Sequence, residues 1–337
     1  MLVVKAPLRV SFIGGGTDFP AFFNGHEQGG SVFGTSISKY VYVMVEHQPE
    51  FEATKFRVTY RVTDSSQSIK ELKHPVVREA LAAHGWSTPL NIATMANLPG
   101  RSGLGSSSAF TVALNHGLNN LREEKTDSSF NYLMQLALNS INIERNLLQE
   151  HGGYQDQLHA SFGGMRRYQF RSNGISVGDQ IKDDDFLSLI SDSLYLVANK
   201  SGRESKTYAQ GTDIRIREGK LHDQLIKMTT LSNDIASQLE SNTTSASTKF
   251  ATLVEGMRDG WELKLKTGVR LKPEVLSQLE LGKLAGASAW KLCGAGGTGF
   301  IAFLVEKQKQ SHFESNFDPK LIFKPRLSGK GVELYEM

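Results

Sequence analysis

Cysteine is almost absent from this sequence, which contains a single one, Cys293. One cysteine excludes an internal disulfide framework and every zinc site that is built from several cysteines. Long hydrophobic runs are missing too, since Tyr40–Val45 has the length of a strand and not of a bilayer span. The first residues also turn polar too early for a signal-peptide core. These absences predict a cytoplasmic protein with no membrane partner.

A large excess of one charge sign is also missing. Lysine and arginine number 38 against 35 aspartates and glutamates, so the formal net charge is +3. An excess this small argues against a nucleic-acid partner, although it is compatible with a few cations gathered in a pocket for an anionic substrate. The 39% hydrophobic and 22% charged residues are typical of an ordinary globular protein.

The order of the expected elements favours an α+β fold. Segments rich in β-branched and aromatic residues predict strands at Val3–Ile13, Tyr40–Glu46, Lys55–Thr63, Leu90–Asn97, Gly164–Phe170, Leu194–Asn199 and Gly299–Val305. Helical periodicity predicts helices at Val76–His84, Ala109–Leu121, Phe130–Glu150, Val254–Thr267 and Pro273–Ala285. The polar stretch Ser232–Thr248 is interpreted as a loop or as the exposed face of a helix. Regular βαβ alternation is not apparent, and we place a domain boundary between residues 180 and 181.

Glycine is the unusual count, with 32 copies that gather in three clusters. The middle cluster, Leu98–Phe110, follows a strand and enters a helix whose first turn holds Ser106, Ser107 and Ser108. Unsatisfied N–H groups at a helix N-terminus attract phosphate, and glycines let the backbone close around it. The ordinary alternative is a glycine turn with a serine N-cap. Because Ser106 stands where a Walker A loop requires lysine, the segment is not a Walker A loop.

The cluster nearest the C-terminus spells G-x-G-x-x-G with Gly294, Gly296 and Gly299. A dinucleotide-binding fold needs a helix after this motif, whereas Phe300–Val305 is predicted to be a strand. The context therefore excludes the dinucleotide interpretation, and a structural turn is the ordinary alternative.

The first cluster follows a strand that carries Arg9. Three consecutive glycines end this strand and deliver Thr17 and Asp18. An aspartate after a glycine turn usually serves the turn itself, but three glycines in a row indicate that a ligand comes close.

Two carboxylates stand out by their positions. Glu144 lies on a largely apolar face of the predicted helix Phe130–Glu150, where it must be paired or metal-bound to offset its desolvation. The ordinary alternative is a salt bridge with Arg145 or with a lysine elsewhere in the chain. Asp156 follows twelve residues later, in a predicted loop, where a solvated aspartate is the ordinary alternative.

Taken together these segments resemble the GHMP kinases, the superfamily of galactokinase and of the homoserine, mevalonate and phosphomevalonate kinases. Its three motifs occur in order as Pro7-Leu-Arg-Val, Gly103-Leu-Gly-Ser-Ser-Ser-Ala and Cys293-Gly-Ala-Gly-Gly-Thr-Gly. The Glu144 and Asp156 pair falls between the second and the third. Within the family, Gly153-Tyr-Gln-Asp-Gln and the glycine cluster after Arg9 resemble the bacterial heptose-phosphate kinases.

The resemblance implies a GHMP kinase fold. Residues 1–180 would form a domain like domain 2 of ribosomal protein S5, with the ATP and Mg²⁺ site. Residues 181–337 would form a ferredoxin-like domain, and the active site would lie between the two. ATP and Mg²⁺ are the cofactors that this fold implies.

The resemblance also implies roles for individual residues. Asp156 matches the catalytic aspartate that faces the substrate hydroxyl, and Arg9 matches the basic residue beside it. Mg²⁺ would be bound by Ser107 and Glu144. Residues that match the nucleotide-binding segments are Pro99, Gly103, Leu104, Gly105, Ser106, Ser107, Ser108, Gly294, Gly296 and Gly297. Residues expected to contact the substrate are Gly16, Thr17, Asp18, Gly153 and Arg203.

The implied activity is phosphorylation of a small-molecule sugar or sugar phosphate, at the anomeric hydroxyl of D-glycero-D-manno-heptose 7-phosphate. The substrate phosphate would need a cationic subsite, for which the candidates are Arg166, Arg167, Arg203 and Lys206. One alternative is a fucokinase- or galactokinase-like enzyme for an unphosphorylated sugar. Another is a sensor that binds sugar and ATP without turnover. A homodimer is compatible with each of these.

Overall fold

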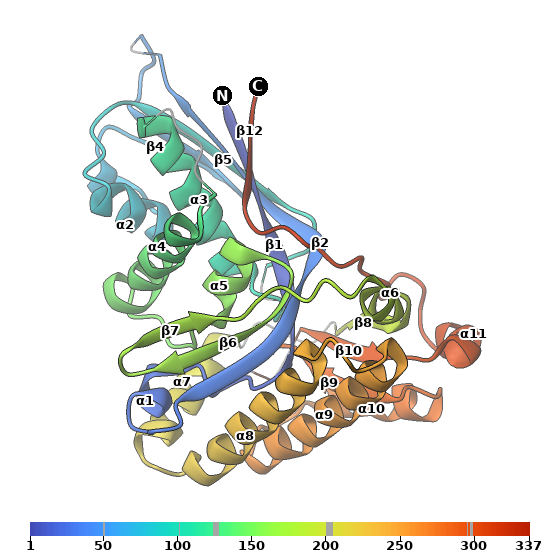
Figure 1. Ribbon diagram of the computed structural model, residues 1–337. Helices are drawn as coiled ribbons and strands as arrows, with labels where there is room; N and C mark the ends of the chain where they lie inside the picture. The colour runs from blue at the N-terminus through green and yellow to red at the C-terminus, as the bar shows by residue number, and fades with distance from the viewer. Residues whose placement is uncertain (50, 101, 124–127, 200–204, 295, 297–298) are drawn as a thin grey trace.

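The computed structural model describes residues 1–337 except 50, 101, 124–127, 200–204, 295 and 297–298. In it the chain forms two β-sheets with helices packed on them (Figure 1). Three of the candidates named above, Arg203, Gly297 and the side chain of Lys206, lie outside what is described. No helix in the described ranges combines the length and the apolar character that crossing a membrane requires.

The first sheet has eight strands and is built around the two longest. They are β1 (Leu2–Ile13), β2 (Gly30–His47), β3 (Phe56–Thr59), β4 (Thr63–Ser66), β5 (Leu90–Ala96), β6 (Met165–Arg171), β7 (Gly174–Val177) and β12 (Glu333–Glu336). The order is β12-β1-β2-β5-β3-β4, and β6 and β7 continue from the first half of β2. Because β1 is buried along almost its whole length, Arg9 on this strand is held by a rigid support.

The second sheet has four antiparallel strands, β8 (Leu194–Ala198), β9 (Ala289–Leu292), β10 (Phe300–Leu304) and β11 (Ile322–Phe323). Their order is β11-β8-β10-β9. The chain passes through helices between β8 and β9 and through a further helix between β10 and β11, which is the ferredoxin-like arrangement. The expected α+β fold is confirmed. The boundary between residues 180 and 181 stays a prediction, and β12 returns the end of the chain to the first sheet.

The helices are α1 (Pro20–Phe23), α2 (Pro75–Ala83), α3 (Ser106–Glu123), α4 (Phe130–Ile141), α5 (Gln155–Phe162), α6 (Asp184–Ser193), α7 (Ser205–Arg217), α8 (His222–Glu240), α9 (Ala246–Lys266), α10 (Pro273–Leu284) and α11 (Gln310–Ser315). Helix α3 lies directly on β1 and β2. A Cβ on Gly117 would come within 3.0 Å of Val45 and 3.3 Å of Val4, so a glycine is needed for this approach. The close packing fixes the direction in which the N-terminus of α3 points.

Three sequence predictions need correction. The chain turns at residues 60–62, so the single strand expected at Lys55–Thr63 is the hairpin of β3 and β4. The stretch Ser232–Thr248 lies mostly within α8 and α9, and Ser232 is buried against Ser31 at 3.2 Å between their hydroxyls, so the loop interpretation is wrong. The helix expected at Phe130–Glu150 ends earlier than predicted, with a consequence for the site below.

Candidate active site

A cavity of ≈ 400 Å³ lies between the N-terminus of α3, strand β1, helix α5 and, from the second half of the chain, α9 and β9. The residues expected from the sequence that line it are Arg9, Gly16, Asp18, Gly103, Gly105, Ser106, Ser107, Ser108, Glu144, Gly153, Asp156 and Gly294. All three glycine clusters and both carboxylates therefore meet at one place, although they are far apart in the sequence.

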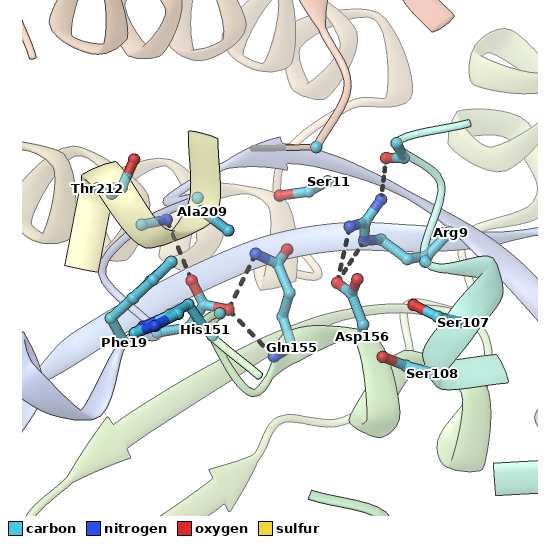
Figure 2. Close-up of a pocket in the computed structure, with 18 of the residues that line it drawn as sticks. Arg9, Ser11, Phe19, Ser107, Ser108, His151, Gln155, Asp156, Ala209 and Thr212 are labelled. Carbon is cyan, nitrogen blue, oxygen red and sulfur yellow. Dashed lines mark hydrogen bonds and ion pairs between the residues drawn. The ribbon is translucent and has the colours of Figure 1, made fainter. Parts of the chain in front are cut away.

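Arg9 and Asp156 form the centre of this cavity (Figure 2). The Nε and Nη2 atoms of Arg9 lie 2.8 and 2.7 Å from Oδ1 of Asp156, and Nη1 donates to the carbonyl oxygen of Gly103 at 2.6 Å. Asp156 lies in the first turn of α5 and not in a loop, which corrects the sequence prediction. Because both contacts fall on Oδ1, Oδ2 remains for a ligand on the side of Gly105, whose Cβ position is 3.4 Å away.

Glu144 lies in a π-helical turn, Asn142–Leu147, that continues α4. Such turns widen the backbone and often occur at functional sites. The carboxylate is buried, and its Oε2 accepts hydrogen bonds from Ser108 at 2.9 Å and from Gln157 at 2.8 Å. The salt bridge considered from the sequence is present as well, with Nη2 of Arg145 at 3.6 Å from Oε2.

The second oxygen of Glu144, Oε1, is buried and has no hydrogen-bond partner among the described residues. Burial raises the pKa of this carboxyl, and the Arg145 guanidinium opposes the rise. A buried carboxylate oxygen that lacks a donor is costly unless a cation or a proton compensates it. The donor set therefore fits a hard divalent cation, which takes carboxylate and hydroxyl oxygens.

The serines of α3 differ in their surroundings. Ser108 is buried and bonded to Glu144, whereas Ser107 is exposed to the cavity. Figure 2 shows both hydroxyl oxygens turned toward Asp156. The sequence could not distinguish the two serines. Neighbouring residues of a helix point to different sides, and only the packing of the helix shows which side faces the cavity.

The glycine clusters after β5 and after β9 pack against each other. Gly103 has φ +74° and Gly294 has φ +80°, a region that favours glycine. A Cβ on Gly103 would meet the carbonyl oxygen of Cys293, and one on Gly294 would lie 2.8 Å from the Cα of Gly103. Two glycines are thus needed for this contact. As predicted, the motif is followed by a strand, β10, and not by the helix that a dinucleotide-binding fold requires.

Comparison with known proteins decides the family. Residues 70–164 match the family model for the GHMP kinases N terminal domain. A D-glycero-alpha-D-manno-heptose 7-phosphate kinase from Campylobacter jejuni is 25% identical over 331 residues, covering 91% of this chain and 90% of that protein. Residues 70–164 form a GHMP kinase N-terminal domain. The relatives are sugar kinases, and the chain is an enzyme, an ATP-dependent phosphotransferase.

A second curated relative and a solved structure were also matched to this chain. A bifunctional fucokinase/GDP-fucose pyrophosphorylase from Arabidopsis thaliana is 23% identical over 335 residues, covering 91% of this chain and 30% of that protein. The crystal structure of a D-glycero-D-manno-heptose 1-phosphate kinase from B. thetaiotaomicron superposes with a TM-score of 0.75 at 20% identity, covering 100% and 99% of the two chains. The expected GHMP kinase fold is confirmed.

Asp18 also lines the kinase cavity and is almost fully buried. Oδ1 accepts from the Gly16 N–H at 3.1 Å, and Oδ2 accepts from the backbone and side chain of Gln155 at 3.1 and 3.0 Å. A Cβ on Gly153 would collide with this carboxylate, which explains the glycine there. Burial raises the pKa of the Asp18 carboxyl, and the nearby charge of Asp156 acts in the same direction.

Some expected contact residues do not line the kinase cavity. The Thr17 hydroxyl is bonded to the carbonyl oxygens of Gly14 and Ser31 and serves the turn. Leu104 is buried and accepts from the backbone of Arg9 at 3.0 Å, so it supports the loop from behind. Pro99, which is exposed, and Gly296 also lie outside the lining.

The proposed phosphate ligands Arg166 and Arg167 are wrong. Arg166 donates to the carbonyl oxygens of Gly163 and Gly178, and Arg167 pairs with Glu240 at 2.7 Å. Both lie outside the cavity lining. Residues that the sequence did not indicate line the cavity in their place: Ser11, Gln155, Trp261, Lys264 and Lys291.

The need for glycine at position 103, in the loop between β5 and α3, leads to a first prediction. Gly103→Ala forces a side chain against Cys293 at a positive φ, which costs about 1–3 kcal/mol. We expect the KM for ATP to rise by roughly tenfold or more, measured by ADP release. Gly100→Ala is the matched control, because a Cβ on exposed Gly100 meets nothing within 4 Å. Equal KM values for both variants and the wild type would show that the loop does not shape the nucleotide site.

Proposed function

We propose that this protein transfers the γ-phosphoryl group of ATP to a hydroxyl group of a sugar or sugar phosphate. The observation that carries the proposal is the placement of Asp156, held through Oδ1 by Arg9, in one cavity with the N-terminus of α3 and the buried carboxylate of Glu144. Phosphoryl transfer needs positioning and charge neutralisation more than covalent help, and this set of residues provides both.

The nucleotide phosphates are assigned to the N-terminus of α3. Gly103 and Gly105, at φ +74° and +77°, bring backbone N–H groups to the end of an 18-residue helix that begins at Ser106. Helix α3 has enough turns for its macrodipole to favour anions at this end. Gly294 supports the loop from the opposite side.

Mg²⁺ is assigned to Glu144 and Ser107. Glu144 and Ser107 line the same cavity, and Oε1 of Glu144 has no hydrogen-bond partner in the part of the chain that the structure describes. Ser108 and Gln157 orient the carboxylate through Oε2. When bound there, the cation neutralises phosphate charge. Orientation of a metal-binding carboxylate by neighbouring donors is itself a common feature of such sites.

Asp156 is assigned to the acceptor hydroxyl. Its Oδ2 is placed to orient this hydroxyl or to accept its proton, and both roles agree with the geometry. Arg9 fixes the carboxylate by two contacts, so the side chain pays little entropy to reach a reactive orientation. Arg9 also presents its positive charge near the transferring phosphoryl group.

For the acceptor we propose the anomeric hydroxyl of D-glycero-D-manno-heptose 7-phosphate. The relative from C. jejuni, which matches along nine tenths of both chains, is named for that substrate. The second candidate is an unphosphorylated sugar, which the fucokinase of A. thaliana favours. A homodimer and a cytoplasmic location stay predictions.

A substrate panel tests the proposed function. ADP release with ATP and Mg²⁺ would be measured for the heptose 7-phosphate, mannose 6-phosphate, fucose, galactose and mevalonate. We expect turnover on the heptose phosphate at least about 100-fold above the free sugars, since a site that binds a charged group rejects analogues without it. Turnover on a free sugar alone would keep the kinase and discard the heptose phosphate. ATP binding without turnover on any compound would favour a sensor.

A further inference from the structure

Two lysines from the second half of the chain also line the cavity. Lys264 lies on α9 and Lys291 on β9, and neither forms an ion pair with a described carboxylate. The ammonium group of Lys291 donates one hydrogen bond, to the carbonyl oxygen of Phe12 at 2.9 Å, which leaves two of its N–H donors. For Lys264 no hydrogen bond to a described residue is found. Its charge is attracted by that of Asp18.

The contacts of Lys264 place this residue at the end of the cavity where the acceptor is expected, and the charge of Lys264 acts on Lys291. The Nζ atom of Lys264 lies 3.9 Å from the position of a Cβ on Gly16, the residue whose N–H binds Asp18. Asp18 in turn accepts from Gln155. Figure 2 shows Ser107 and Ser108 on one side of Asp156 and Gln155 on the other. The end occupied by Lys264 is therefore opposite the N-terminus of α3, where the nucleotide phosphates are assigned.

Two polar atoms between these ends also lack partners. The hydroxyl of Ser11 and Oε1 of Gln155 belong to side chains that are more than nine tenths buried, and neither atom has a hydrogen-bond partner among the described residues. Both residues line the cavity, with Ser11 near its centre in Figure 2. Buried polar atoms are normally satisfied, so a ligand with hydroxyl groups fits this middle section.

The charge of the lysines is costly without a ligand. Burial lowers the pKa of Lys264, and Asp18 opposes this effect. The pKa of Lys291 is lowered to about 8, chiefly by burial, and the positive charges of Lys264 and Arg9 act in the same direction. A bound dianion offsets the desolvation of two ammonium groups at once.

We propose that Lys264 and Lys291 bind a phosphate monoester of the acceptor, remote from the hydroxyl that Asp156 faces, and so select sugar phosphates over free sugars. This rests on the proposed function, because it needs a sugar acceptor in the same cavity. It assigns the substrate phosphate to α9 and β9, in place of Arg166 and Arg167. The lysines are specificity-determining residues, since the group that they bind is remote from the hydroxyl that Asp156 faces.

The experiment compares the heptose 7-phosphate with the same heptose lacking the phosphate. For Lys264→Met we expect kcat/KM for the sugar phosphate to fall roughly 10- to 100-fold, the loss expected for one charge-assisted hydrogen bond. Lys264→Arg keeps the charge and should recover part of this loss. Lys266→Met, an exposed lysine two residues further on α9, is the matched control and should behave as wild type. Since Lys264 has no ion-pair partner among the residues that the structure describes, its replacement by Met should not unfold the protein.

The outcomes separate this inference from the proposed function. If the wild type prefers the phosphorylated sugar and Lys264→Met and Lys291→Met both keep that preference, the lysine subsite is overturned while the kinase stands. Equal wild-type turnover on both sugars also overturns it. If no sugar is turned over, the proposed function fails, and calorimetry without ATP then decides the subsite. Sugar-phosphate binding that is lost in Lys264→Met would support it, and no binding would overturn it.

Calorimetry offers a second readout, because a bound anion stabilises the protonated form of Lys291 and raises its pKa. Near pH 8.5 binding of the sugar phosphate should therefore take up protons, seen as a binding heat that depends on the ionisation enthalpy of the buffer. Lys291→Met should reduce this uptake, and an unchanged value would contradict the assignment. Charged and titratable groups that face the two lysines are Arg9, Asp18, Asp156, Arg215 and Cys293.

Discussion

Replacing Asp156 by asparagine is expected to lower kcat by roughly 10²- to 10⁴-fold, the usual range for a group that accepts or orients a reacting proton. Asparagine has the same shape and keeps an oxygen for Arg9, so the two contacts at 2.8 and 2.7 Å can persist as weaker hydrogen bonds. What is lost is the negative charge that attracts the hydroxyl proton. The change should therefore appear in kcat, with little effect on the KM for ATP.

The control for Asp156→Asn is Glu240→Gln. Glu240 is also ion-paired with an arginine, Arg167 at 2.7 Å, and its side chain is 26% exposed against 23% for Asp156. It lies outside the cavity lining, so its replacement should leave kcat unchanged. A kcat for Asp156→Asn within tenfold of the wild type would remove Asp156 from the reaction and leave the structural role in holding Arg9.

Glu144→Gln should show opposite effects on activity and on stability. We expect kcat/KM to fall by at least about 100-fold at fixed Mg²⁺, because the amide binds a hard cation poorly. Higher Mg²⁺ should restore part of the activity. When ADP release is titrated with Mg²⁺, the Mg²⁺ concentration that gives half-maximal activity should be higher for the variant than for the wild type. The control is Glu150→Gln, which changes another acidic residue that lines the same cavity. This variant should show the same Mg²⁺ dependence as the wild type.

The second expected effect of Glu144→Gln concerns the stability of the unliganded protein. Burial raises the pKa of Glu144 above its unfolded value, so the native state binds this proton more tightly than the unfolded state. Stability therefore falls as the pH rises above the unfolded pKa and through the raised one. Glutamine carries no charge, so at neutral pH unliganded Glu144→Gln should resist thermal unfolding at least as well as the wild type. A clear loss of stability with normal activity would mean that Glu144 only anchors Arg145 and Ser108.

The glycine clusters could be found in the sequence because their cause is local. Gly103 and Gly294 have positive φ values, and the Cβ of any other residue would meet a neighbouring backbone. Such positions admit one residue type wherever they occur, so they leave a visible pattern. The same holds for the strands, whose β-branched composition follows from half-buried sheet positions.

The lysines of the acceptor end could not be found in this way. Lys264 and Lys291 stand at ordinary positions of a helix and a strand, and nothing in their neighbours distinguishes them from exposed Lys266. Their role depends on how α9 and β9 pack over β1, which is set by contacts between distant segments. For the same reason Arg166 and Arg167 seemed suitable from placement alone, although their side chains are bonded elsewhere.

The start of helix α5 could not be predicted from the sequence either. Asp156 was expected in a loop because the short α5 begins only one residue before it, at Gln155, and ends at Phe162. A helix of this length has little intrinsic stability and forms through packing. The helical position suits the role proposed for Asp156, since a helical backbone restricts this residue more than a loop would.

The return of β12 to β1 has a consequence for how the protein is made. Strand β1 pairs with β12 along residues 2–5, and these partners, at 333–336, leave the ribosome after the other strands that the structure describes. Until then one edge of β1 stays open, and open edges invite pairing with other chains. The nascent protein thus carries an unprotected strand until residues 333–336 have been made, and a chain that stops before residue 333 keeps it permanently. Truncated products should consequently aggregate even though the whole catalytic cavity has already been synthesised.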